Sequence, residues 1–159
     1  MKRLIAKLSF IIVAFMAVTF MSCGSEYPNE GYFTVGETTY TVNDAKLEDL
    51  GFENGYYQLR LVLDNTENND SHSINFLVYS EVNTYLPSGL YVPYMYDDQY
   101  NHKIKRAAWV VGDEIEGVIW AGFMRVSKSD EIYTIRFDCQ DMNDNDITGY
   151  YNGEMRVMI

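Results

Sequence analysis

Histidine and cysteine are scarce in this sequence, with two of each among 159 residues. His72 and His102 lie in separate polar segments, where we expect both to be solvated, and no further histidine accompanies them. A zinc site usually draws four nitrogen or sulfur ligands from short spacings, so the composition argues against one. The common signatures of serine hydrolases, metalloproteases, dinucleotide sites and phosphate loops are also missing. We therefore expect no enzyme, although a paired-carboxylate glycosidase stays open because the fold alone places its two acids.

Positive charge is in short supply as well. The sequence has twelve basic and twenty-three acidic residues, and three of the basic ones lie within the first seven positions. The chain from Cys23 onward therefore has nine basic residues and a net charge of −14. A field of that sign repels polyanions. We expect the protein to bind neither nucleic acid nor anionic lipid head groups.

No apolar run is long enough to cross a membrane comfortably. The longest, Leu8–Phe20, has thirteen residues, whereas a spanning helix needs roughly twenty. Three basic residues precede the run, and the small residue Ser22 stands directly before Cys23. A positive start, a short apolar run and a small residue before a cysteine are typical of a lipoprotein signal peptide. The sequence thus predicts a signal peptide over residues 1–22.

Cleavage after this segment would make Cys23 the first residue of the mature chain. Its thiol and new amino group would carry acyl chains, palmitate among them, that hold the protein to a membrane. Residues 23–30 would then form a short tether and residues 31–159 one domain. An uncleaved anchor is the second interpretation. Soluble secretion is the third, because Phe20 stands where ordinary cleavage wants a small residue. The predicted location is the cell envelope, as an outer-membrane lipoprotein facing either the periplasm or the surface.

Lipid attachment at Cys23 leaves Cys139 as the remaining thiol, which excludes an intramolecular disulfide. Cys139 ends an alternating apolar set that begins at Tyr133. Reactive cysteines are exposed and lie near a base or a cation, whereas this phase places Cys139 on the inner face of a strand. We expect a buried, unreactive thiol.

Alternation with a period of two runs through most of the chain and predicts strands with one wet face. The inward sets are Tyr57, Leu59, Leu61 and Leu63; Ile74, Phe76 and Val78; Tyr133, Ile135 and Phe137; and Met155, Val157 and Ile159. Gly36-Glu37 separates two further runs and predicts a tight hairpin. Turn residues recur at the short spacing of antiparallel folds. The fold class is therefore all-β, as an antiparallel β-sandwich or a lipocalin-like barrel of about eight to ten strands.

Three segments depart from simple alternation. Residues 107–111 and 118–123 are apolar at consecutive positions, which favours central strands covered on both faces. Trp109 and Trp120, within these runs, are expected in the core. Residues 44–50 are predicted to form a helical turn, with Asp44 as its cap and a glycine as its stop.

Two regions give the chain a familiar layout: the closing strands, with Tyr133–Asp138 followed by Ile147–Gly153, and the segment Leu86–Tyr91. These motifs resemble the small all-β lipoproteins of the Bacteroidota type. Most members of that group have no assigned function. The resemblance implies an envelope location and a β-sandwich or lipocalin-like barrel, and it implies no catalytic residue.

One loop has oxygen side chains at alternate positions: Asp141, Asn143, Asn145 and Asp146. Calcium takes such ligands, and the phase resembles the start of an EF-hand loop. The glycine at the sixth position and the bidentate glutamate at the twelfth are missing, since Asp146 and Asn152 stand there. Asn and Asp also favour β-turns, so the sequence favours a plain hairpin turn over a Ca²⁺ site.

The other candidate site is rich in tyrosine. Tyr91, Tyr94, Tyr96 and Tyr100 are interleaved with Asp97 and Asp98. Flat rings beside hydrogen-bonding groups suit the binding of sugars or other small ligands. Tyrosine is also a good strand former, so packing against the sheet is the stronger alternative for these rings.

Two functions from different classes stay open. The domain is either a lipid-anchored module that binds a glycan or another small ligand, or a structural or accessory protein that contacts other envelope proteins. An exposed aromatic row beside a hollow would favour the first function. A broad exposed apolar patch would favour the second.

Overall fold

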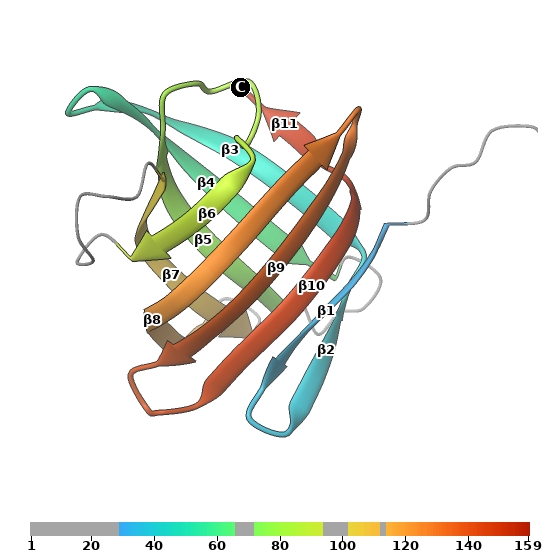
Figure 1. Ribbon diagram of the computed structural model, residues 1–159. Helices are drawn as coiled ribbons and strands as arrows, with labels where there is room; N and C mark the ends of the chain where they lie inside the picture. The colour runs from blue at the N-terminus through green and yellow to red at the C-terminus, as the bar shows by residue number, and fades with distance from the viewer. Residues whose placement is uncertain (1–28, 66–71, 94–101, 112–113) are drawn as a thin grey trace, which may run out of the picture.

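The computed structural model describes residues 29–65, 72–93, 102–111 and 114–159, and within these ranges it contains eleven strands and no helix (Figure 1). It follows that no helix in the described part of the chain is long and apolar enough to cross a membrane. The strands are β1 (Glu30–Val35), β2 (Thr38–Val42), β3 (Asp44–Glu53), β4 (Tyr56–Asp64), β5 (His72–Ser80), β6 (Gly89–Pro93), β7 (His102–Val111), β8 (Glu114–Ser129), β9 (Ile132–Asp141), β10 (Asp146–Glu154) and β11 (Arg156–Met158).

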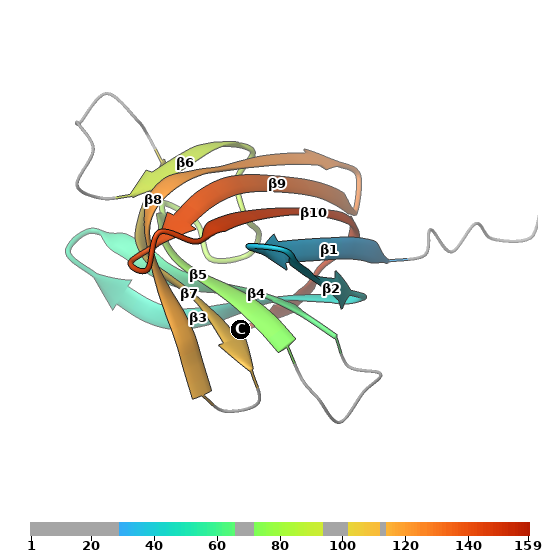
Figure 2. The same ribbon diagram turned by 90° about the horizontal axis from the view of Figure 1, so that it is seen from below.

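All eleven strands belong to one curled sheet with the order β11-β3-β4-β5-β7-β6-β8-β9-β10-β1-β2. Most neighbours are antiparallel, but β6 pairs with β7, and β11 with β3, in parallel. Figure 2 shows how the sheet curls into a half-barrel, with β8, β9, β10 and β1 facing β3, β4, β5 and β7. The all-β prediction is confirmed. The sheet is mixed rather than purely antiparallel, and it has one strand more than the expected range.

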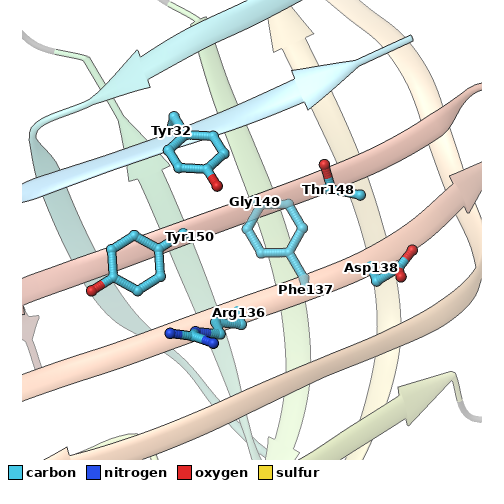
Figure 3. A pocket seen from close by; sticks show the side chains of 7 residues that line it. All are labelled: Tyr32, Arg136, Phe137, Asp138, Thr148, Gly149 and Tyr150. Carbon is cyan, nitrogen blue, oxygen red and sulfur yellow. The ribbon is translucent and has the colours of Figure 1, made fainter.

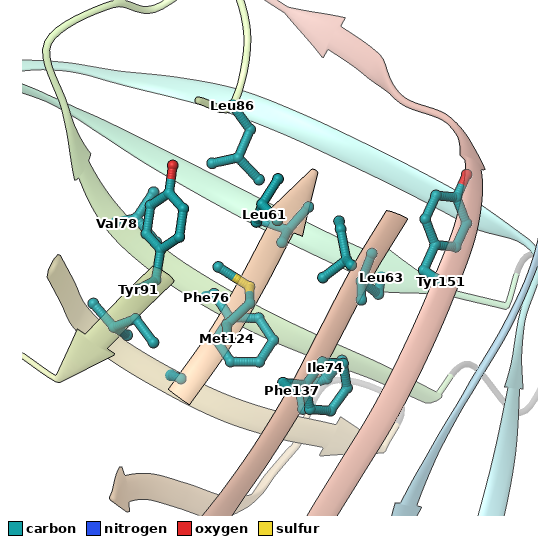
Figure 4. Packing of buried hydrophobic residues seen from close by; sticks show 14 of the residues in the cluster. Leu61, Leu63, Ile74, Phe76, Val78, Leu86, Tyr91, Met124, Phe137 and Tyr151 are labelled. Atoms are coloured by element: carbon teal, nitrogen blue, oxygen red, sulfur yellow. The ribbon is translucent and has the colours of Figure 1, made fainter. Parts of the chain in front are cut away.

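Because successive side chains of a strand point to opposite faces, the alternating apolar residues point into the interior of the curled sheet. Leu59, Leu61 and Leu63 of β4 are fully buried, and the neighbouring Arg60 is exposed. The inward residues of β5 and β9 are also buried, and the rings of Phe76 and Phe137 from these strands lie 5.2 Å apart (Figure 4). These strands and the hairpin between β1 and β2 form as the sequence predicts.

The predicted helical turn over residues 44–50 is wrong, because this segment belongs to strand β3. Ala45 and Leu47 are both fully buried and alternate with Lys46, which is the phase of a strand. Asp44 does not cap a helix. Its carboxylate accepts a hydrogen bond from the Arg156 Nε at 3.1 Å, so long-range pairing with β11 overrides the local helix signals.

The expectation that residues 118–123 are covered on both faces is also wrong. The side chains of Val118, Trp120 and Phe123 are 40%, 49% and 40% exposed, so Trp120 is not a core residue. A bulge between Ile119 and Ala121 shifts the phase of β8 in this segment, and Gly122, which follows it, has a φ of 111°. Trp109 on β7 does pack against the core, partly buried.

The last predicted inward set also faces solvent in part. Val157 is 37% and Ile159 83% exposed, whereas Met155 packs against the core. The reason is topological: β11 ends the strand order and pairs with β3, so little of the sheet covers its apolar side chains.

Candidate functional site

An open hollow of about 510 Å³ lies on the outer face of β1, β9 and β10 (Figure 3). Alternating residues of these strands point outward, because their neighbours fill the core. The lining residues are Tyr32, Arg136, Phe137, Asp138, Thr148, Gly149 and Tyr150. The sheet register thus gathers two aromatic rings, a guanidinium, a carboxylate and a hydroxyl from three strands.

The pairing of the strands explains which side chains meet. Tyr32 is opposite Tyr150, and Tyr150 is opposite Arg136, so these three form one row across the sheet. The two tyrosine rings have centroids 6.4 Å apart and planes inclined at 40°. The Arg136 guanidinium lies 5.4 Å from the centroid of the Tyr150 ring, within the range of a cation–π contact.

A second row lies beside the first and supplies hydrogen-bonding groups. Thr148 is opposite Asp138, and both side chains are exposed. Among the described residues, neither Asp138 nor Arg136 has an ion-pair partner within 4 Å. Their carboxylate oxygens and N–H groups are therefore available to a bound molecule.

The floor of the hollow is tightly packed. Gly149 is opposite Phe137, whose ring points into the core and is 3% exposed. A β-carbon at Gly149 would overlap that ring, so only glycine fits here with this packing. Because buried side chains support the floor, the outer rings stand on a rigid surface.

Of the six residues of the tyrosine-rich candidate site, the structure describes one, Tyr91. Tyr91 is fully buried, and its hydroxyl donates a hydrogen bond to the Pro87 carbonyl at 2.7 Å. Burial raises the pKa of its hydroxyl. Tyr91 therefore packs against the sheet, which is the alternative that the sequence favours for it. The other residues proposed for this site are outside the described ranges: Tyr94, Tyr96, Asp97, Asp98 and Tyr100.

Asp141 is the centre of the turn between β9 and β10. Its buried carboxylate accepts hydrogen bonds from the backbone N–H groups of Asn143 and Asn145, at 2.9 and 3.0 Å, and from the Asn145 amide at 2.9 Å. The Trp109 indole N–H adds a longer contact of 3.4 Å. Burial alone would raise the pKa of Asp141, but these donors hold it below its ordinary value.

The arrangement around Asp141 is that of a hairpin turn. Both carboxylate oxygens are engaged with donors, and Asn143 and Asp146 are exposed. In the described part of the chain, no group of three or more His, Cys, Asp or Glu side chains is arranged to hold a metal ion. The turn interpretation therefore agrees with the geometry, and the calcium interpretation stays a prediction.

Cys139 is buried, as predicted. Burial raises the pKa of its thiol to about 12, so the reactive thiolate is not formed at neutral pH. The histidines are less exposed than expected: both begin strands, His72 lies 4.4 Å from the Tyr40 ring and His102 stacks on Tyr91 at 4.6 Å. Cys139, His72 and His102 thus contribute to packing.

Comparison of the chain with protein-family models, with curated proteins and with solved structures finds no match.

The outer hollow is not predicted from the sequence. Tyr32 and Tyr150 look like ordinary outward residues of alternating strands, and only the pairing of β1 with β10 brings them together. The signal in the sequence is weak: both strands place a tyrosine on the face where a wet sheet usually carries charged or small polar side chains.

Proposed function

We propose that the protein is a lipid-anchored binding module of the cell envelope, and that it binds a glycan in the hollow formed by Tyr32, Tyr150 and their neighbours. The observation that carries this proposal is the combination of two outward tyrosine rings with the polar side chains of Arg136, Asp138 and Thr148 on one rigid face. Sugar rings present an apolar C–H face and a rim of hydroxyls. In the hollow, a tyrosine ring can stack on the C–H face, and the polar side chains can form hydrogen bonds with the hydroxyls.

Tyr32 is the platform for the sugar ring, because its side chain is 47% exposed. Asp138 accepts hydrogen bonds from sugar hydroxyls, and Thr148 donates or accepts them. Tyr150 contributes its ring edge and holds Arg136 in place. We assign binding rather than catalysis to this set of side chains.

For the finer fold, we propose a lipocalin-like barrel rather than a sandwich. Two features support closure of the sheet: only Asn43 separates β2 from β3, and only Met155 separates β10 from β11. Since β11 directly follows β10 and pairs with β3, the chain itself bridges the opening between the β10 side of the curl and the β3 end of the sheet. Buried side chains such as Phe76 and Phe137 occupy the interior, so the ligand binds outside the barrel instead of in its centre.

The lipid anchor places this surface close to the membrane. Tyr32 follows Cys23 by nine residues, which span at most about 30 Å when fully extended. Asn29, just before β1, accepts a hydrogen bond from the Glu154 N–H at 2.9 Å and so attaches the start of the domain to the end of β10. With a lipid on Cys23, the protein is an outer-membrane lipoprotein, similar in layout to the small all-β lipoproteins of the Bacteroidota type.

A second function is favoured by a different observation. Apolar side chains line the outer face of β8 and the next hairpin: Ile115, Val118, Trp120, Phe123 and Met142, with exposures of 64%, 40%, 49%, 40% and 71%. Such a patch suits contact with another envelope protein. This accessory role is the alternative to glycan binding.

Matched tyrosine variants test the glycan proposal. Tyr32 and Tyr56 are 47% and 45% exposed, but Tyr56 lies at the start of β4, away from the hollow. On a glycan array, Tyr32→Ala should lose the signal of the parent protein and Tyr56→Ala should keep it. Each change should cost less than about 1 kcal/mol in stability, since both rings face solvent. Equal loss in both variants, or none in either, would contradict the proposal.

A further inference from the structure

Two arginines stand opposite each other beside the hollow. Arg125 of β8 and Arg136 of β9 are register partners, and both side chains are exposed. Directly opposed residues on antiparallel strands have β-carbons about 5 Å apart, and like charges at such positions destabilise the pair. The arrangement therefore works against folding unless an anion relieves the repulsion.

No acidic side chain in the described ranges neutralises this arginine pair. Ion pairs within 4 Å are formed by other basic residues: Lys46, Arg60, Lys105 and Arg156. The absence of a partner is notable in a chain with about twice as many acidic as basic residues. Asp138, the acid nearest along β9, is two residues from Arg136 and hence about 7 Å away along the strand.

The surroundings orient the guanidinium groups for a ligand. Arg136 stacks 5.4 Å from the Tyr150 ring centroid, which restricts its side chain, and no residue in the described ranges forms an ion pair with its N–H groups. Arg125, Arg136, Tyr150 and Tyr32 continue as one row over four strands, a span of about 14 Å. A ligand that contacts the whole row has to be extended, as an oligosaccharide is.

We infer that Arg125 and Arg136 form an anion subsite, and that the glycan bound in the hollow is acidic, with a carboxylate or a sulfate group seated between the two guanidiniums. Guanidinium groups form charge-assisted, bidentate hydrogen bonds with such oxygens. The negative charge of the rest of the chain does not prevent this contact, because salt screens exposed charges beyond about 10 Å. The inference rests on the proposed function, since it names the class of glycan for the same hollow.

Calorimetric titration of the full chain in detergent tests the subsite. The probes are a tetramer of galacturonate, a heparin-derived sulfated tetrasaccharide and neutral cellotetraose. At least one acidic probe should bind about tenfold or more tightly than cellotetraose, and the better acidic probe identifies carboxylate or sulfate as the preferred group. Arg125→Gln and Arg136→Gln should each weaken that binding about tenfold or more, as expected for loss of a charge-assisted hydrogen bond.

The control variant is Arg106→Gln. Arg106 is exposed on β7, on the facing wall, and has no ion pair with a described residue. The Arg106→Gln variant changes the net charge by the same amount as Arg125→Gln or Arg136→Gln, and it should leave the binding of the acidic probes unchanged. The melting temperature gives a second readout: Arg125→Gln should not lower it, because the change removes a repulsion, whereas a purely structural arginine would lower it on replacement.

The outcomes separate the subsite from the glycan proposal. Equal affinity for neutral and acidic tetramers, reduced for both by Tyr32→Ala, would overturn the anion subsite and support glycan binding. Acidic binding that survives both arginine changes would also overturn the subsite. Failure of the parent to bind any of the three tetramers would count against both proposals.

Discussion

At the scale of single residues, buried polar groups fix the local geometry of this fold. Asp141 is the clearest case, because its side chain satisfies two backbone N–H groups of the turn that follows it. Asp144 in that turn has a φ of 63°, a conformation that Asn and Asp tolerate better than most residues. The sequence predicts a turn here from residue types, but it does not show that one carboxylate holds the turn together.

Asp141→Asn should destabilise the protein by about 2 kcal/mol at pH 7, because one charged acceptor of several hydrogen bonds is lost. Asp144→Asn is the control, since its exposed side chain tolerates the change. The folded-state pKa of Asp141 is depressed, so its stabilising effect is present above the unfolded pKa near 4 and disappears as the pH falls through the folded value. In urea unfolding, the difference between parent and Asp141→Asn should narrow as the pH is lowered below the unfolded pKa near 4. A difference independent of pH would contradict this role.

The parent protein and the Asp141→Asn variant also test whether the turn at Asp141 binds calcium. A ligand that binds only the folded state raises its melting temperature. If the segment is a turn alone, millimolar calcium leaves the melting temperatures of parent and Asp141→Asn unchanged. A calcium-dependent rise that Asp141→Asn abolishes would support the metal site.

At the scale of strands, the sequence predicts the strands in which apolar and polar residues alternate, because the pleat of the strand then decides which side chains are buried. Leu59, Leu61 and Leu63 alternate cleanly, and β4 forms as expected. Residues 44–50 carry helix signals, yet pairing with β4 and β11 makes them a strand. Sequence patterns do not reveal these partners, because the residues of β11 lie more than a hundred positions away.

Strand register also explains why sequence patterns do not reveal the hollow. Its aromatic residues come from positions 32 and 150, and its charged residues from 136 and 138. The sequence of each strand by itself shows only that one of its faces is exposed to solvent. The proposed binding surface arises from the lateral order β9, β10, β1, which no local periodicity specifies.

At the scale of the whole molecule, we propose one arrangement of anchor and binding face: a lipid at Cys23, a short tether and a hollow that begins at Tyr32. Metabolic labelling with palmitate in a bacterial host tests the anchor. Parent protein and Cys139→Ala should incorporate label, and Cys23→Ala should not, because Cys139 is a buried thiol. Mass spectrometry that finds a mature chain with unmodified Cys23, or an uncleaved signal segment, would contradict lipidation.

The central claim is that the outer face of β1, β9 and β10 binds a glycan. Nuclear magnetic resonance of the ¹⁵N-labelled full chain in detergent, titrated with the tightest-binding tetrasaccharide, tests it most directly. We predict amide shifts that concentrate at Tyr32, Arg136, Thr148 and Tyr150 and are absent from Tyr32→Ala. Shifts confined to the apolar residues of β8 around Val118 and Trp120, or scattered over the molecule, would contradict the claim.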